Sequence, residues 1–261
     1  MDQTTSHSDY FVHSVAKGFE VLKAFDSSSI SLSLRELSER TGINKATVRR
    51  FALTLVDLGY LKIIQEKRFQ LSPKMLDFAF HFLQSLNLPD LIQPILETMS
   101  ATVQEATNLA ILDGHEIVYV SRVNATNRIV GANLSVGSRL PYYATSLGKA
   151  LVAWLPENER REIWESTTIE AFTQQTITTF DTFEEDLAKS RMRGYTIGDE
   201  ELEQGLCSIS MPIINHQGAT IAAINISTQV IRTDKKKLLE IYLPVLQEGV
   251  KKINQQTGIK K

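Results

Sequence analysis

The segment "TGINKATVRRF", Thr41 to Phe51, decides how the N-terminal part of this chain folds. It contains a glycine and then Lys45, Arg49 and Arg50, which place three cations within six residues. The 261-residue chain has a net charge of −2, so this positive charge is a local concentration. Residues 1–75 carry 11 Lys and Arg against 8 Asp and Glu, whereas the rest of the chain carries 17 against 22. This asymmetry indicates a small domain that faces an anion and a larger one that does not.

Two predicted helices flank Gly42. Ser33 and Glu36 form the S-x-x-E pattern of a capping box, which opens a helix that ends just before the glycine. Asn44 is the predicted N-cap of the next helix, which spans Lys45 to Leu58. On that helix the apolar residues share one arc, and the cations occupy the remaining circumference. The cationic side is therefore exposed near the start of the second helix.

An earlier helix and a later hairpin complete this N-terminal pattern. Residues 14–25 carry apolar side chains at helical spacing, and residues 60–72 read as two short strands with Lys67 and Arg68 at their tip. This order predicts a winged helix-turn-helix, whose second helix enters the major groove of DNA. The simpler alternative is that the cations are only the solvated face of a helix.

The predicted DNA-binding residues lie on the two central helices and in the wing. Arginine can bind guanine through two hydrogen bonds, and Ala or Thr can contact the methyl group of thymine. Cations in the wing would contact phosphates or the minor groove and so position the protein. The full set is Arg35, Lys45, Ala46, Thr47, Arg49, Arg50, Lys67 and Arg68.

The rest of the chain predicts a connector and a second domain. Residues 73–89, between two prolines, form an apolar helix with apolar groups on more than one face, which favours burial against a partner chain. Beyond it, helices are expected near residues 91–103, 146–154, 157–165, 183–192 and 234–254, and strands at residues 107–113, 116–123, 128–134, 194–198, 206–214 and 219–227. Strands in adjacent hairpins with helices on one side favour an α+β domain with an antiparallel sheet.

Composition limits the classes of function that remain open. The chain is 43% hydrophobic and 22% charged, which is ordinary for a globular protein. Cys207 is its only cysteine, so no intramolecular disulfide can form, as suits a reducing cytosol. The N-terminus is polar and acidic rather than a signal peptide, and no apolar run reaches about 18 residues. We therefore expect a cytoplasmic protein without a membrane segment.

Residues 14–71 resemble the DNA-binding domain of IclR-type transcriptional regulators, through "SVAKGFEVLKAF" and "LRELSERTGINKATVRRFALTLVDLGYL". The later segments "GSRLPYYATSLGKALVAWLP", "RGYTIGDEELEQGLCSISMPI" and "GATIAAINIS" resemble the effector-binding domain of the same family. The connector, "FQLSPKMLDFAFHFLQSLNLP", looks most like that of the branch controlling the catabolism of aromatic acids such as protocatechuate and 4-hydroxybenzoate. The resemblance spans nearly the whole chain in the family's order.

The resemblance implies three parts, which are a winged helix-turn-helix over residues 1–72, a connector helix over 73–89 and a GAF-like effector domain over 90–261. It implies a small-molecule pocket between the sheet and its helices and loops. It also implies a regulator that binds a double-stranded DNA operator as a homodimer, and such dimers can pair into tetramers. Carried over position by position, the pocket residues are Leu140, Thr145, Ser146, Leu147, Asp199 or a close neighbour, Leu206, Cys207 or Ser208, Asn225 and Ser227.

Part of this pocket follows from the residues themselves. Asn225 and Ser227 are polar, lie two apart on an apolar strand and so point to the same face. Buried polar groups need partners, and a ligand can be one, although neighbouring backbone or water would also satisfy them. Arg122 and Arg139 could each bind a carboxylate through a pair of N–H donors. We rank Arg122 first, because Arg139 lies in a stretch that is generic to the family.

The predicted effector is a small carboxylate, and the branch resemblance favours an aromatic one such as a hydroxybenzoate. A small aliphatic keto or sugar acid is the alternative. An enzyme on a GAF-like fold is the alternative from another class, but the sequence has no nucleophile elbow, P-loop or dinucleotide-binding motif. The histidines show no metal-ligand spacing, and the acidic run from Asp199 to Glu203 is expected to be solvated. We predict no catalytic residue, metal or cofactor.

Overall fold

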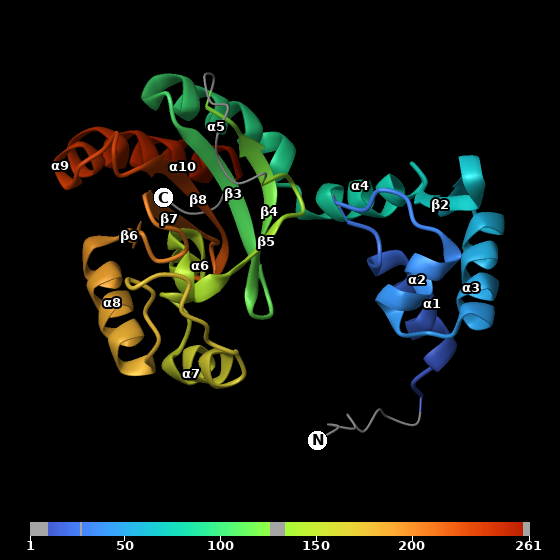
Figure 1. Cartoon of the computed structure of the whole chain (residues 1–261). Helices are drawn as coiled ribbons and strands as arrows, with labels where there is room; N and C mark the ends of the chain where they lie inside the picture. The colour runs from blue at the N-terminus through green and yellow to red at the C-terminus, as the bar shows by residue number, and fades with distance from the viewer. Residues whose placement is uncertain (1–9, 27, 126–133, 258–261) are drawn as a thin grey trace. The chain divides into compact units, whose positions relative to one another are not determined.

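The computed structural model describes residues 10–26, 28–125 and 134–257. The chain divides into two compact units, Met1–Ser85 and Leu86–Lys261, and each is described here by itself. Figure 1 shows the elements of both units along the chain. None of the helices in the described part is long and apolar enough to cross a lipid bilayer.

The N-terminal unit has the order of elements that the sequence predicts for a winged helix-turn-helix. Three helices surround a small core, and a two-stranded antiparallel hairpin forms the wing, with a short 3-10 turn at its tip. These elements are α1 (His13–Lys23), α2 (Leu34–Thr41), α3 (Lys45–Asp57), β1 (Leu61–Ile64) and β2 (Arg68–Leu71).

Local side-chain chemistry fixes the turn between α2 and α3. The backbone N–H of Glu36 donates to Ser33 Oγ (3.3 Å), and the N–H of Ser33 donates to a carboxylate oxygen of Glu36 (2.7 Å), which completes the predicted capping box. Gly42 ends α2 with φ of 67°, a left-handed conformation that glycine adopts without strain. The N–H of Thr47 donates to Asn44 Oδ1 (3.0 Å), which confirms the predicted cap of α3.

The connector helix α4 (Met75–Leu86) carries an unusual amount of exposed apolar surface. None of its residues is buried within this chain, and four of its large apolar side chains are at least 49% exposed, namely Leu76, Phe78, Phe80 and Phe82. Phe78 stacks on the ring of Tyr60 in the winged unit, with centroids 5.5 Å apart. A helix this apolar is expected to be covered by something outside the single chain.

The C-terminal unit is built on a six-stranded antiparallel sheet with the order β5-β4-β3-β8-β7-β6. Its strands are β3 (Ala106–Asp113), β4 (Glu116–Val123), β5 (Arg139–Pro141), β6 (Thr196–Asp199), β7 (Leu206–Ile214) and β8 (Thr220–Gln229). The short strand β5 is absent from the predicted elements. Of the predicted strand over residues 128–134, all but Leu134 lies outside the described residues, and Leu134 is not in a strand.

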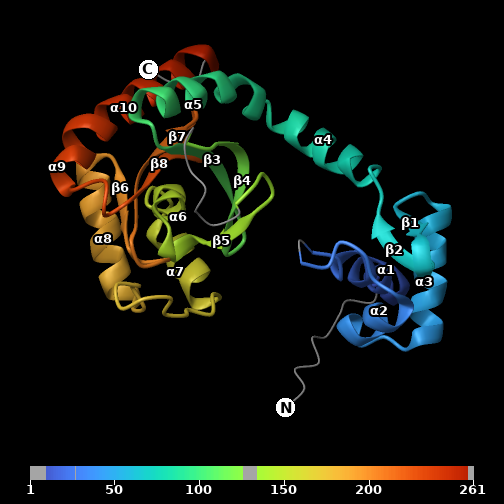
Figure 2. The same ribbon diagram turned by 45° about the horizontal axis from the view of Figure 1, so that its top comes forward.

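Helices cover both faces of the curled sheet. Figure 2 shows α5 (Pro89–Val103) and α10 (Leu243–Thr257) side by side across the outer face, while α6 (Ser146–Val152) lies inside the curl. A short helix α9 (Lys235–Lys237) and a π-helical turn over Leu238–Tyr242 lead into α10.

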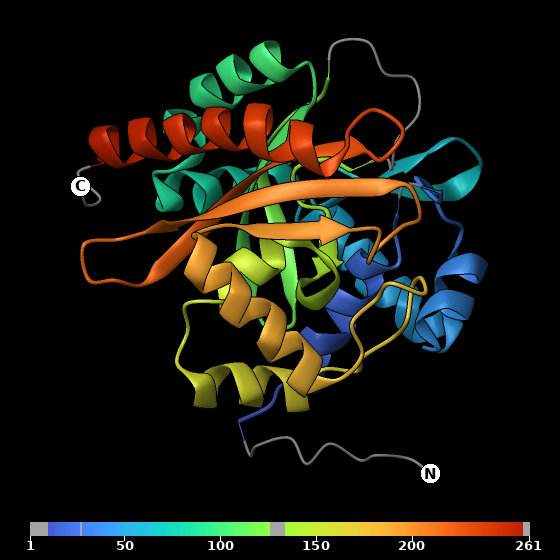
Figure 3. The ribbon, with the colours of Figure 1, turned by 90° about the vertical axis from the view of Figure 1, so that its left-hand side faces the viewer.

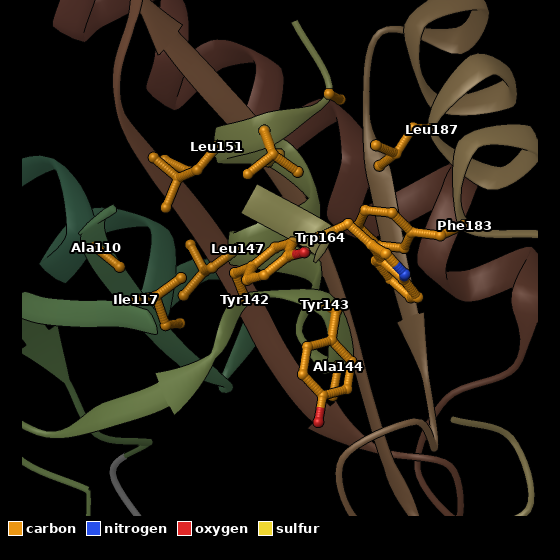
Figure 4. Close-up of a cluster of buried hydrophobic side chains, with 14 of the residues drawn as sticks. Ala110, Ile117, Tyr142, Tyr143, Ala144, Leu147, Leu151, Trp164, Phe183 and Leu187 are labelled. Atoms are coloured by element: carbon orange, nitrogen blue, oxygen red, sulfur yellow. The ribbon is translucent and has the colours of Figure 1, made fainter. Parts of the chain in front are cut away.

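The remaining two helices pack beside α6 and extend the core on the inner side of the sheet. They are α7 (Glu157–Glu165) and α8 (Phe180–Arg193), visible in Figure 3. Figure 4 shows the shared core, in which Tyr142, Leu147, Trp164 and Phe183 come together. A Cβ atom at Gly148 of α6 would lie 2.1 Å from the backbone oxygen of Tyr142, so only glycine allows this close packing. The core therefore fixes α6 against the sheet.

Candidate functional site

Helix α3 presents its cations to solvent because its other side is buried. Val48, Ala52 and Leu55 fill the core of the winged unit. The side chains on the opposite arc are exposed at four of the five predicted positions, and the fifth, Thr47, is half-buried; the exposed ones are Lys45, Ala46, Arg49 and Arg50. The three cations make no ion pair with any described residue.

The other predicted DNA contacts differ in their surroundings. Arg35 is exposed at the start of α2 and pairs with Glu39 at 2.7 Å. Lys67 is exposed in the turn of the wing, where its φ is 59°. Arg68 is half-buried and donates to the backbone oxygen of Ser31 (2.7 Å) and to Glu36 (3.0 Å). Arg68 therefore fastens the wing to the start of α2.

The carboxylate of Glu36 accepts hydrogen bonds from Ser33 and Arg68. Its pKa is lowered to about 2, first by the hydrogen bond from the backbone of Ser33, then by that from the Ser33 side chain and by Arg68. Because the ionised form accepts all of these bonds, Glu36 stays charged at any pH at which the protein works.

The C-terminal unit contains a cavity of about 400 Å³ between the inner face of the sheet, α6 and the adjoining loops. This volume suits a small organic ligand. Nine of the predicted effector-binding residues line it, and these are Arg122, Leu140, Thr145, Ser146, Leu147, Leu206, Ser208, Asn225 and Ser227. The leucines supply apolar walls, while the serines, Asn225 and Arg122 supply polar groups.

The other three predicted residues lie outside the cavity lining. Cys207 is next to Ser208 on β7, so strand alternation turns it to the outer face, where burial raises the pKa of its thiol to about 11. Asp199 pairs with Cys207 across the strands, shares that face and is exposed; its neighbour Gly198 lines the cavity instead. Arg139 is exposed and forms ion pairs with Asp113 and Glu116.

Glu201 also lines the cavity, and here the expectation of a solvated acidic run is wrong. Its side chain is buried and accepts a 2.7 Å bond from Nζ of Lys149, which is itself 1% exposed and lies 3.0 Å from Asp186. Burial, the largest effect, raises the pKa of the Glu201 carboxyl, and the attraction to Lys149 opposes it. The sequence does hold a signal for this pair, because a lysine in the apolar helix of Ser146–Val152 needs a buried counterion.

A chain of polar side chains reaches the cavity from the sheet. Arg122 Nη1 donates to Asn108 Oδ1 (2.8 Å), and Asn108 Nδ2 donates to Asn225 Oδ1 (2.7 Å). Asn108 is fully buried and is absent from the predicted site. Farther along β7, Ser210 Oγ donates to Ser146 Oγ (2.6 Å) on α6. The wall of the cavity formed by the sheet is thus polar, and the walls formed by the leucine side chains are apolar.

No three His, Cys, Asp or Glu side chains in the described part of the chain are grouped as metal ligands. The thiol of Cys207 is buried and faces away from the cavity, so the cavity offers no activated sulfur nucleophile. The arrangement instead presents hydrogen-bond donors and acceptors around an apolar space, which suits reversible ligand binding.

Models of known protein families match both units of the chain. The model described as the IclR helix-turn-helix domain matches residues 14–62, and that of the bacterial transcriptional regulator IclR C-terminal domain matches residues 80–255. The Pca regulon regulatory protein of Pseudomonas putida is 36% identical over 236 residues, which cover 90% of this chain and 81% of that protein.

Two further proteins are similar to this chain. The p-hydroxybenzoate hydroxylase transcriptional activator of Acinetobacter baylyi is 35% identical over 240 residues, covering 90% of this chain and 88% of that protein. A crystal structure from Acinetobacter, of a double mutant of the PobR inducer-binding domain in complex with 3-hydroxybenzoic acid, superimposes with a TM-score of 0.60 and 34% identity. It covers 64% of this chain and 97% of that domain.

Proposed function

The chain belongs to the IclR family of bacterial DNA-binding transcriptional regulators, and we propose that it controls a catabolic operon in response to a small aromatic carboxylate. This family comprises regulators rather than enzymes, which settles the choice between those two classes. The proposed site of action is the bacterial cytoplasm, where the chain would reach its operator.

In the proposed DNA complex, α3 enters the major groove. Lys45, Arg49 and Arg50 would contact bases or phosphates from its exposed arc, and Lys67 would contact the backbone or minor groove from the wing. Two chains would pair as a homodimer, which places two recognition helices on the two halves of a palindromic operator. The exposed apolar surface of α4 is the proposed dimer contact, and pairs of dimers would make a tetramer.

The proposed effector lies in the cavity of the C-terminal unit. The single observation that supports an acid most strongly is Arg122, a half-buried guanidinium in the cavity wall that makes no ion pair with any described residue. The side chains of Leu140, Leu147 and Leu206 would cover the faces of an aromatic ring. Two similar proteins support the aromatic class, since their names link them to p-hydroxybenzoate hydroxylase and to a 3-hydroxybenzoic acid complex.

A small aliphatic keto or sugar acid is the second candidate. Arg122 would bind its carboxylate equally well, but the three leucines would have little apolar surface to cover. The apolar wall therefore favours the aromatic acid.

Isothermal titration calorimetry of the full chain with protocatechuate, 4-hydroxybenzoate, glyoxylate and a sugar acid tests this proposal. We expect the two aromatic acids to bind, and Arg122→Ala to weaken binding by about 1.5–3 kcal/mol through loss of a charged hydrogen bond. Arg139→Ala is the matched control, because that arginine lies outside the cavity and should leave binding unchanged. Binding of only the aliphatic acids would refute the aromatic assignment.

A further inference from the structure

Five polar residues form a single row across the sheet. The strand register pairs Arg122 with Asn108, Asn108 with Asn225, Asn225 with Ser210, and Ser210 with Thr196. Residues paired across antiparallel strands project to the same face, and here that face borders α6 and the cavity. Asn108, Ser210 and Thr196 are all 0% exposed. A row this deeply buried must be satisfied by its own hydrogen bonds or by a ligand.

The hydrogen bonds of Arg122 determine which way each amide in the row is turned. A guanidinium only donates, so the group of Asn108 that faces Arg122 must be its oxygen. The NH2 group of Asn108 then faces Asn225 and donates to its side-chain oxygen. The NH2 group of Asn225 is thereby turned away from Asn108.

That NH2 group has no partner among the described residues. Asn225 is 4% exposed, and it lines the cavity. The hydroxyl of Ser210, its neighbour on the other side, donates to Ser146 Oγ and forms no hydrogen bond with the amide of Asn225. A buried amide with unused donors is costly unless something in the cavity accepts from it.

Arg122 contributes unused donors to the same wall. Its Nε donates to Asn124 (2.9 Å), one terminal nitrogen donates to Asn108, and the guanidinium lies 5.9 Å from the ring centroid of Tyr119. Its other terminal nitrogen has no hydrogen-bond partner among the described residues. Burial lowers the pKa of this guanidinium, as expected for a cation whose solvent has been removed without a counterion.

We propose that Asn108 is a positioning residue. By turning the amide of Asn225, it makes the cavity wall formed by Arg122 and Asn225 present only hydrogen-bond donors. Such a wall selects a ligand with a carboxylate over the same ligand with a neutral amide in its place. The proposal rests on the function proposed above and extends it to the orientation of the ligand. The carboxylate of the effector accepts hydrogen bonds from Asn225 Nδ2 and Arg122. Its ring hydroxyl is directed to Ser208 on β7 and to Glu201 in the loop between β6 and β7, since the carboxylate of Glu201 repels the acid group of the ligand.

The variant Asn108→Asp tests this directly, because the new side chain has nearly the same shape but only accepts hydrogen bonds. Arg122 still donates to it, but Asn225 must now rotate its NH2 group toward it and present its oxygen to the cavity. The probes are 4-hydroxybenzoate and 4-hydroxybenzamide, which share a ring and a hydroxyl group. Calorimetry on the full chain gives the ratio of the two affinities, and loss of packing alone would lower both affinities alike. Because the new carboxylate beside Arg122 also disfavours an acid by its charge, a crystal structure of the variant with 4-hydroxybenzamide is the companion measurement. Only rotation of Asn225 places the NH2 group of that ligand against Asn225 Oδ1.

We expect the wild-type chain to prefer the acid, and Asn108→Asp to reduce that preference by at least about tenfold. Thr107→Val is the matched control, because Thr107 is equally buried on the adjacent position but faces α5 and donates to the backbone of Leu96. It should leave the preference unchanged. A folded Asn108→Asp chain with the wild-type preference would overturn the inference and leave the proposed function standing. A wild-type chain that binds no carboxylate would overturn both.

A crystal structure of the wild-type chain with 4-hydroxybenzoate is the second measurement, should Asn108→Asp fail to fold. The inference requires a carboxylate oxygen within hydrogen-bond distance of Asn225 Nδ2. A ring hydroxyl in that position, with the carboxylate at another wall, would overturn it.

Discussion

At the scale of single residues, the partners of each cation separate those that hold the winged unit together from those available to DNA. Arg40 donates to the backbone oxygen of Ala24 (2.8 Å) and pairs with Asp26 (2.8 Å), and Arg68 is committed to Ser31 and Glu36. Arg49 and Arg50 have no such commitments among the described residues. Residue type alone does not distinguish these arginines, but their position on the fold does.

We predict that Arg49→Ala and Arg50→Ala each weaken operator binding while leaving folding and effector binding intact. Loss of a base contact should cost about 1–3 kcal/mol and relax the sequence preference at one position, as gel-shift titrations on operator variants would show. Loss of a phosphate contact should instead weaken all sequences alike and flatten the salt dependence. Lys23→Ala, a change to an exposed cation of α1, is the control. Undiminished affinity in both arginine variants would reject the proposed docking.

At the scale of elements, the helix α4 combines an apolar sequence with a solvent-exposed position in the single chain. Four of its large apolar residues are exposed, although an apolar helix of this length normally lies in a core. A second copy of the chain would cover this surface and offer an identical one in return.

We predict that the double variant Phe82→Glu, Leu83→Glu dissociates the dimer, because burying unpaired charge at an apolar contact is costly. Multi-angle light scattering would report a fall in mass relative to the wild-type chain. Circular dichroism would show whether the variant remains folded. A well-folded variant with unchanged mass would mean that α4 is not an interface.

Helices whose ends are set by neighbouring residues were predictable from the sequence. Features that depend on residues far apart in the sequence were not. The capping box of Ser33 and Glu36 and the Gly42 turn follow from neighbours a few residues apart, so α2 and α3 begin as predicted and end within one residue of the predicted positions. Strand β5 is three residues long, too short for alternation to reveal it. The sequence does not decide whether Cys207 or Ser208 of β7 points into the cavity, because this depends on the pairing of Ser208 with Ser227 on β8.

Asn108 and Glu201 show the same limit within the site. Asn108 bonds Asn225 across 117 positions, and Glu201 bonds Lys149 across 52. A polar residue in an apolar strand indicates that a partner exists, but the sequence does not identify it. The predicted site therefore held nine residues of the cavity lining but named neither Asn108, which orients Asn225, nor Glu201.

At the scale of the whole molecule, a ligand-responsive regulator requires that occupation of the cavity alter DNA binding. A ligand can do this only if it binds one arrangement of the protein more tightly than another. A tenfold change in DNA affinity needs about 1.4 kcal/mol of such coupling, within the usual range for allosteric proteins. A few hydrogen bonds from Arg122 and Asn225 that form in only one arrangement would supply it.

The most direct test of a ligand-responsive regulator is a fluorescence anisotropy titration of the full chain on DNA from upstream of its own gene. The titration is run with and without saturating 4-hydroxybenzoate, and repeated with Arg122→Ala. We predict that the acid shifts the DNA affinity of the wild-type chain by at least about tenfold, and that Arg122→Ala binds DNA normally but no longer responds. Identical isotherms with and without an acid that calorimetry shows to be bound would contradict the account.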